Sequence, residues 1–174
     1  EPTNLIKQEC RDPSTYNSII QAIALGATKL SEISNQVGIE TGLCTTYIKK
    51  LISLGIIIKD TPIYKPSKKQ TIYLLADHMF QFWYKFVLPN ISLINMGMGD
   101  RVYKKIEPHF YEFMGYIFED ICKQYLWLLN IHEELPLFFL KLGRWWGNDT
   151  RIKAEAEIDI VAYNDENQIL IGEC

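Results

Sequence analysis

The sequence lacks the signatures of several large classes of protein. Its 174 residues include four cysteines without a Cys-x-x-Cys pair and three histidines without an HExxH arrangement, which excludes the common zinc-site spacings. No G-x-x-x-x-G-K-[ST] motif occurs, so this sequence has no P-loop to cradle nucleotide phosphates. The uncharged run around 86–98 is broken by Pro89, Asn90 and Asn95, and it is too short and too polar to span a bilayer.

The cysteines are scattered along the sequence, at Cys10, Cys44, Cys122 and Cys174. This spacing is typical of reduced thiols in the cytosol, and no signal-peptide pattern precedes them. We therefore expect a cytoplasmic protein without a membrane partner. Because the sequence begins at Glu1 without a methionine and stops inside an apparent strand, we also expect it to be a piece of a longer protein.

The composition is that of a globular protein, with 48% hydrophobic, 13% aromatic and 22% charged residues. The formal net charge of −3 does not indicate a general binder of polyanions. That average hides a basic stretch, because residues 41–70 contain six lysines and one aspartate. The stretch therefore carries +5, and the remainder of the chain carries −8.

The first part of the sequence predicts three short helices followed by a β-hairpin. Apolar residues recur at helical spacing over 16–25, 30–37 and 41–54, and a glycine follows each run. Ser14 or Thr15 is expected to cap the first helix. Two β-rich runs, 56–59 and 71–75, flank a long tip that contains Pro62 and Pro66. This order predicts a winged helix-turn-helix domain over residues 1–76.

The second part of the sequence is helical and then β-rich. An aromatic helix capped by Asp77 and ended by Pro89 opens a helical linker over 77–106. A long helix with a continuous apolar stripe reaches about Leu129, and strands follow over 138–146, 157–163 and 168–174. The predicted fold class is therefore α+β, with a partial α/β domain over 107–174.

Polar and basic residues of the third helix and of the hairpin tip are candidates for binding double-stranded DNA. Small polar and lysine side chains on the non-core side of such a helix can reach phosphates and base edges in a major groove. Lysines in a long wing loop can follow the DNA backbone, giving binding that weakens with salt. Docking of another protein, or a merely solvated loop, remains the alternative. The candidates are Thr45, Thr46, Lys49, Lys50, Lys65, Lys68 and Lys69.

Carboxylates in the last two strands are candidates for a metal site. Alternation along a strand places Glu157 and Asp159 on one face and Ile158 and Ile160 on the other. A three-residue turn over 165–167 would set Asp159 opposite Glu173. Paired carboxylates suit Mg²⁺ or Mn²⁺, which can activate water against a phosphodiester. The alternative is an exposed acidic face of an edge hairpin.

Several short segments of the sequence together resemble a known family. The chain is similar to the C-terminal region of archaeal-type P-loop ATPases, in which a winged helix links the ATPase to a nuclease-like domain of the PD-(D/E)XK superfamily. The resemblance covers almost the whole chain. Its words are EPTNL at 1–5, YNSII at 16–20, FQFWYKFV at 80–87, GYIFE at 115–119, GRWWG at 143–147, EIDIV at 157–161 and GEC at 172–174.

The resemblance implies a restriction-endonuclease-like fold for 107–174 and roles for three acids. Glu119 matches the helical acid, Asp159 the strand aspartate and Glu173 the first residue of the Glu-x-Lys pair, whose lysine would follow Cys174. These three would be catalytic, with Asp159 and Glu173 binding the metal. The resemblance also implies that ATP is bound only by the protein's own N-terminal ATPase domain. Two functions follow: metal-dependent phosphodiester cleavage, or a non-catalytic module that docks DNA or protein and regulates the ATPase.

Overall fold

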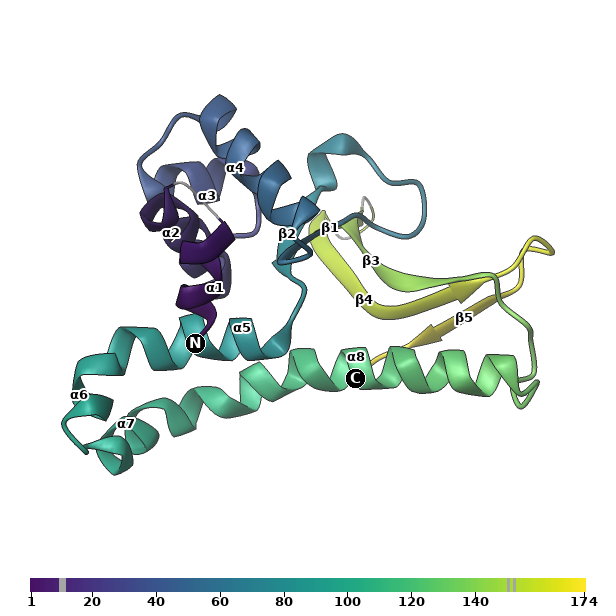
Figure 1. Cartoon of the computed structure of the whole chain (residues 1–174). Coiled ribbons are helices and arrows are strands. Elements are labelled where there is room, and N and C mark those ends of the chain that lie inside the picture. Colours follow the sequence, from purple (N-terminus) through teal and green to yellow (C-terminus); the bar gives the residue numbers. More distant parts are fainter. Residues whose placement is uncertain (10–11, 150, 152) are drawn as a thin grey trace. The chain divides into compact units, whose positions relative to one another are not determined.

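The computed structural model describes residues 1–9, 12–149, 151 and 153–174, except for the side chain of Lys68. Helices and two small antiparallel sheets make up the chain (Figure 1), which confirms the α+β class. Contacts divide the chain into two compact parts. Unit 1 comprises Glu1–Asp60 and Ile72–Ile106, and unit 2 comprises Thr61–Thr71 and Glu107–Cys174. A search of the described helices finds none with the length and hydropathy needed to cross a membrane.

Unit 1 begins with helices and a two-stranded hairpin in the order that the sequence predicts. A preceding helix, α1, has no counterpart among the predicted elements. Asp12, rather than Ser14 or Thr15, caps α2, because its Oδ1 accepts the Thr15 N–H at 3.5 Å. The elements are α1 (Pro2–Glu9), α2 (Pro13–Ala24), α3 (Leu30–Val37), α4 (Thr41–Ser53), β1 (Ile57–Asp60) and β2 (Ile72–Leu75).

The core of unit 1 is apolar and closely buried. Isoleucines from α1, α2, α3, α4 and β1 meet there, joined by the phenol ring of Tyr84. Gly38, with φ of 76°, ends α3 in the left-handed region and lets the chain turn directly into α4. The core side chains that are fully buried include Ile6, Ile19, Ile20, Ile33, Ile48, Leu51 and Ile57.

The last part of unit 1 is helical beyond the point where the sequence predicts an end. Asp77 caps α5 (His78–Phe82) by accepting the Phe80 N–H at 2.9 Å, as predicted. The chain then continues through a π-helical turn over Trp83–Val87 and a 3₁₀ turn over Leu88–Asn90. Pro89 stands in the first positions of that 3₁₀ turn, directly after the π-helical turn, and the chain stays helical through it, so it does not end the helix. Helices α6 (Ile91–Asn95) and α7 (Gly99–Ile106) follow.

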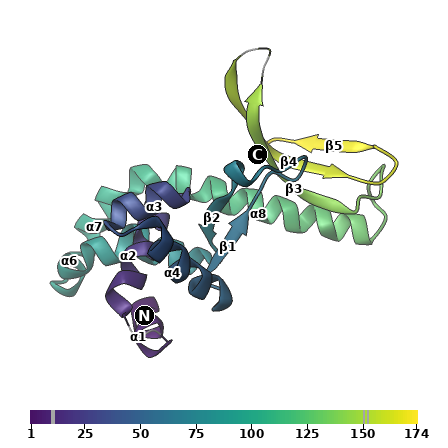
Figure 2. The same cartoon turned by 90° about the horizontal axis from the view of Figure 1, so that it is seen from above.

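Unit 2 consists of one long helix, α8 (Phe110–Ile131), and a three-stranded antiparallel sheet in the order β3-β4-β5. The strands are β3 (Lys141–Asp149), β4 (Ala154–Tyr163) and β5 (Ile169–Gly172). The β3–β4 hairpin projects beyond β5, as Figure 2 shows. Asn164 N–H donates to Gln168 O across the predicted three-residue turn, where Asn167 has a φ of 62°.

β3 starts at Lys141 rather than at the predicted residue 138. The side chain of Asn130, at the end of α8, accepts the Phe139 N–H at 2.9 Å and donates to the Phe139 carbonyl at 3.0 Å. Phe139 is fully buried and its ring meets that of Trp127 edge to face. Because both backbone groups of Phe139 are bound to Asn130, they do not enter the sheet, and strand pairing begins two residues later.

The segment Thr61–Thr71, expected as the tip of the first domain's hairpin, has its contacts within unit 2. The Ile63 N–H donates to the Arg144 carbonyl at 2.9 Å. Gln70 Nε2 donates to the Trp146 carbonyl at 2.7 Å, and Trp146 Nε1 donates back to the Gln70 carbonyl at 3.2 Å. The segment therefore covers the outer edge of β3, which protects an otherwise open sheet edge.

Candidate functional site

Two groups of predicted site residues can be compared with the structure: an acidic group in unit 2 and a basic group on α4. The acidic group forms where α8 packs against β4. Glu119 lies on α8, whereas Glu157 and Asp159 lie on β4. Both strand acids act electrostatically on the Glu119 carboxylate, so the structure brings these three side chains into one environment.

A β-bulge decides which side chains of β4 face this environment. The register moves from Gly143↔Val161 to Trp145↔Ile158, so two steps along β3 match three steps along β4. As a result Ile158 shares an outer face with Val161 and Tyr163, where the three residues line a hollow of about 720 Å³. The simple alternation predicted from sequence, with Ile158 and Ile160 on one face, is therefore wrong beyond Ile158.

Arg144 of β3 joins the acids of α8 and β4. Its Nε lies 3.4 Å from Glu119 Oε2, and its Nη2 contacts Glu157 Oε1. Lys123, one turn along α8, places its Nζ 3.6 Å from the same Glu119 oxygen. The Arg144 and Glu119 side chains are only 14% and 13% exposed, so this ion pair is largely removed from water. Two cations are thus held by the fold beside the acidic group.

The environment of Glu119 disfavours its charged form. Burial is the main cause that raises the pKa of Glu119, and the charges of Asp159 and Glu157 act in the same direction. Arg144 and Lys123 oppose the rise without cancelling it. A carboxyl with a raised pKa beside other acids is a frequent property of functional sites, although structural ion networks share it.

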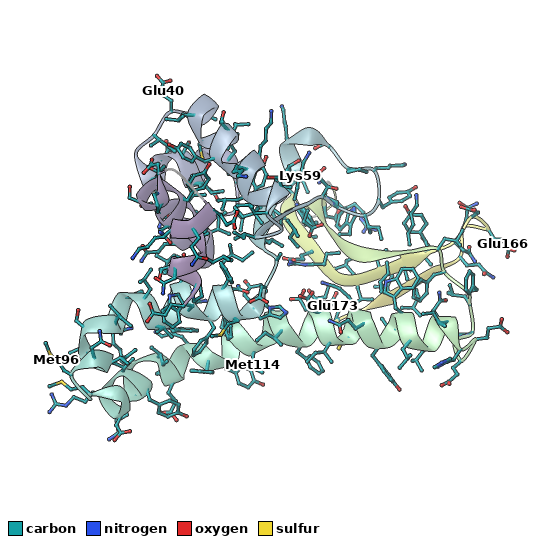
Figure 3. The ribbon with its side chains drawn as sticks, in the orientation of Figure 1. Glu40, Lys59, Met96, Met114, Glu166 and Glu173 are labelled. Carbon is teal, nitrogen blue, oxygen red and sulfur yellow. The ribbon has the colours of Figure 1, made fainter. Side chains whose placement is uncertain are left out.

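Asp159 and Glu173 occupy neighbouring strands but have different surroundings. The register Ile160↔Gly172 continues toward Asp159 and Glu173, as the sequence predicts. Asp159 Oδ2 accepts the backbone N–H of Cys174 at 3.0 Å. Glu173 is exposed at the end of β5, and Figure 3 shows it beyond that strand. Across the ranges that the structure describes, no three His, Cys, Asp or Glu side chains are grouped so as to hold a metal ion.

Two thiols adjoin the acidic group. Cys174 is a hydrogen-bond partner of Cys122 on α8, and neither is in a disulfide. Burial, followed by the contact with Cys122 and the nearby acids, raises the pKa of the Cys174 thiol to about 11. Burial, with smaller contributions from Cys122 and the nearby acids, therefore keeps this thiol protonated and slow to react.

Sequence reasoning missed Arg144, Lys123 and Cys122 as members of this group. Lys123 stands four residues after Glu119 on a predicted helix, a spacing that could have revealed the pair. Arg144 lies in the Gly-Arg-Trp-Trp-Gly segment at 143–147, which supported the family resemblance but was given no role in a site. A Cβ at Gly143 would lie 3.2 Å from Ile63 Cδ1, and one at Gly147 would lie 3.2 Å from Gln70 Nε2. The two glycines therefore let segment 61–71 approach β3 on either side of Arg144.

The basic candidates on α4 lie on its solvent side. Lys49, Lys50 and Thr46 are exposed, and Thr45 is half-buried. The hydroxyls of Thr45 and Thr46 donate to the Thr41 and Gly42 carbonyls at 2.8 and 3.3 Å, so both are already engaged by the helix itself. The two lysines are therefore the groups of α4 that are best placed to meet phosphates.

The orientation of α4 is fixed by a contact with the start of α2. Tyr47 donates its hydroxyl hydrogen to Asp12 Oδ2 at 3.0 Å, and its ring meets that of Tyr16 edge to face. Hydrogen bonds from Thr15, Ser14 and Tyr47 lower the pKa of Asp12 to about 2. The capping aspartate of α2 therefore also holds the helix that presents Lys49 and Lys50.

The lysines of the hairpin tip belong to unit 2. Lys65 and Lys69 are exposed, and Lys65 Nζ lies 5.1 Å from the centre of the Tyr64 ring. The side chain of Lys68 is outside the described part of the chain. Because the tip is bound to β3 through Ile63 and Gln70, its lysines are presented by the sheet of unit 2 rather than by a free loop.

Comparison with known proteins gives one family and one curated relative. Residues 83–174 match DUF234, a family described as archaea bacterial proteins of unknown function. The chain is 36% identical over 165 residues to the uncharacterized protein MJECL04 of Methanocaldococcus jannaschii. The alignment covers 94% of this chain but 36% of the relative, so the chain spans about a third of that protein's length. No solved structure matches the chain.

Proposed function

The chain belongs to the DUF234 family, and within it we propose that the chain is a DNA-docking region of a longer protein. In this proposal unit 1 is a winged helix whose α4 lies in the major groove of double-stranded DNA, where its lysines meet the phosphates. Unit 2 is a nuclease-like unit that does not cleave the DNA that unit 1 binds. The observation that carries the proposal is the pair of exposed lysines, Lys49 and Lys50, on the solvent side of a helix whose orientation Asp12 and Tyr47 fix.

The order of elements supports a winged helix in unit 1. Helices α2, α3 and α4 are followed by the β1–β2 hairpin, and the turn between α3 and α4 is short. A helix-turn-helix uses the second helix of the pair for the major groove, which assigns that role to α4. Unit 1 contains ten Lys and Arg against eight Asp and Glu, whereas unit 2 contains eight against thirteen. Electrostatics therefore favour unit 1 as the part that meets DNA.

We also propose that the longer protein is an ATPase that binds ATP in its own N-terminal domain and that this chain regulates it. The support is the family resemblance of the sequence words, together with the fact that the chain covers 36% of its curated relative. A DNA-docking region next to an ATPase would couple nucleotide use to contact with DNA.

Metal-dependent phosphodiester cleavage is the second candidate function. It is favoured by the proximity of Glu119 and Asp159, which the resemblance implies as catalytic acids. The donor set does not fit Mg²⁺ or Mn²⁺ as arranged, however. Glu119 is paired with Arg144 and Lys123, and Asp159 accepts a backbone N–H, while Glu173 lies exposed. For this reason we favour binding over cleavage and derive no cleavage step.

The experiment that tests DNA docking is a salt series of binding to a fluorescent duplex, measured by anisotropy. Lysine contacts with phosphates release counterions, so the logarithm of the binding constant falls linearly with the logarithm of the salt concentration. The double variant Lys49→Gln and Lys50→Gln is expected to bind more weakly and to lower the slope by about 2, or about 1 for each lysine.

The matched control is Lys7→Gln with Lys104→Gln, which removes two exposed lysines of unit 1 from α1 and α7. It makes the same change in net charge but leaves α4 intact, so its slope should stay close to that of the wild type. Equal loss in both double variants would mean that only general charge matters. Binding that does not weaken with salt would contradict the phosphate contacts altogether.

A further inference from the structure

The position of Arg144 within the acidic group has a consequence beyond docking. Three carboxylates, Glu119, Glu157 and Asp159, share this environment with the cations Arg144 and Lys123. The formal charge of the five side chains is therefore −1. The guanidinium lies within ion-pair distance of two of the acids, since Nε is 3.4 Å from Glu119 Oε2 and Nη2 donates a hydrogen bond to Glu157. A planar guanidinium suits such a bridge between two carboxylates.

Burial makes the contacts of Glu119 with Arg144 and Lys123 stronger than ordinary surface pairs, whereas Glu157 is 49% exposed in its pair with Arg144. Arg144, Glu119 and Lys123 are 14%, 13% and 20% exposed, whereas Arg151 on the same hairpin is 87% exposed in its pair with Asp149. Screening by water and salt weakens exposed pairs and acts much less on buried ones. Removing one partner from a buried pair leaves a charge without compensation, which is costly. The acids around Arg144 are therefore held to a fixed cation.

A divalent metal needs the same carboxylate oxygens. Mg²⁺ and Mn²⁺ bind hard oxygen ligands that converge on one point. Here Glu119 Oε2 already lies 3.4 Å from Arg144 Nε and 3.6 Å from Lys123 Nζ. Both cations repel an incoming divalent ion, and their removal would leave the acids with a negative charge to be neutralised.

We propose that Arg144 is the built-in counter-ion of this acidic group, taking the place that a divalent cation would have between Glu119 and the acids of β4. This inference rests on the proposed function and deepens it, because it gives the reason why the nuclease-like unit does not cleave DNA. Arg144 is a positioning residue in this account. It sets the acids of α8 and β4 against one another and excludes the metal.

The test is titration of the full chain with Mn²⁺ alone, with free Mn²⁺ counted by electron paramagnetic resonance. Wild type is expected to bind no Mn²⁺ at the acidic group. Arg144→Gln removes the charge but keeps a polar side chain, and it should create Mn²⁺ binding at least about tenfold tighter than any residual binding by wild type. Adding Asp159→Asn to Arg144→Gln should abolish the gain. Arg151→Gln, which removes an exposed arginine of the same sheet, should not produce it.

Two results would overturn the inference. One is stoichiometric Mn²⁺ binding by wild type that Asp159→Asn or Glu119→Gln removes, since the acids would then accept a metal with Arg144 in place. The other is an Arg144→Gln variant that binds Mn²⁺ no more tightly than Arg151→Gln. If Arg144→Gln does not fold, as judged by circular dichroism, the wild-type titration and Arg144→Lys decide. Arg144→Lys keeps the charge and should exclude Mn²⁺ as wild type does. The titration contains no DNA, so its failure is distinct from a failure of the lysine variants on α4.

Discussion

Each of the two units is stabilised internally by a different kind of interaction. Unit 1 has a core of apolar side chains from almost every element, many of them fully buried. Unit 2 has few buried apolar residues, among them Phe113, Phe139 and Ile160, and depends on polar side chains that bind backbone groups. Apolar burial is insensitive to charge, whereas hydrogen-bonded and ionic contacts depend on each partner. The comparison therefore predicts that unit 1 is destabilised most by cavities in its core. Unit 2 is expected to be destabilised most by the loss of single polar side chains.

The largest effect is expected from a cavity in unit 1. Leu51 of α4 is fully buried, and Leu51→Ala should lower the free energy of unfolding by about 2–5 kcal/mol. Leu43→Ala on the same helix removes a side chain that is 49% exposed and should cost less than about 1 kcal/mol. Urea unfolding followed by circular dichroism measures both. Similar costs for the two leucines would contradict an apolar core around α4.

A polar substitution is expected to be nearly as damaging in unit 2. Asn130→Ala would leave both the N–H and the carbonyl of buried Phe139 without their partner, at a cost of about 2–4 kcal/mol. Asn148→Ala, at an exposed position of β3, is the matched control and should be nearly neutral. Hydrogen exchange of the Phe139 amide gives the local measurement. An amide that stays protected in Asn130→Ala would show that the strand start does not depend on this side chain.

These substitutions also mark how far the sequence predicts the fold. The helices that glycines end, the Asp77 cap and the three-residue turn before β5 follow from local rules and are confirmed. The predicted start of β3 was wrong because Asn130 acts through a tertiary contact. The predicted cap of α2 was wrong for a different reason, because Asp12 followed by Pro13 is itself a local start signal that the prediction passed over. No local sequence pattern shows that the Asn130 side chain, nine residues before Phe139, will hydrogen-bond both backbone groups of Phe139.

The candidate site was predictable to a similar degree. The approach of Glu119 to Asp159 was implied only by the family resemblance, whereas the register that leads toward Glu173 agrees with the three-residue turn expected from the sequence. The bulge in β4 and the position of Arg144 could not be predicted, because both depend on how β3 pairs with β4 and how segment 61–71 packs on it. A prediction from alternating side chains assumes a regular strand. It is wrong at a β-bulge, where one strand has an extra residue.

The smallest effect is expected from lowering the pH, and it concerns the stability of unit 1. The pKa of Asp12 is lowered from its ordinary value of 3.8 to about 2. The charged carboxylate therefore contributes its full stabilisation of the folded state at pH values above 3.8. That contribution is lost as the pH falls through about 2. Asp12→Asn keeps an acceptor at the cap but does not titrate, so wild type should be the more stable at pH 5 and the difference should shrink toward pH 2. Urea unfolding across this range measures it, and a constant difference would contradict the role of charge.

The most direct test of the account is one gel of end-labelled duplex DNA incubated with the chain and Mn²⁺, scored for both retention and strand length. Binding through α4 without cleavage predicts that the duplex is retained and stays intact, and that Lys49→Gln with Lys50→Gln releases it. Shortened strands that disappear with Asp159→Ala would show that the acidic group cleaves despite Arg144, and an unretained duplex would show that α4 does not dock DNA. Either result would contradict the account.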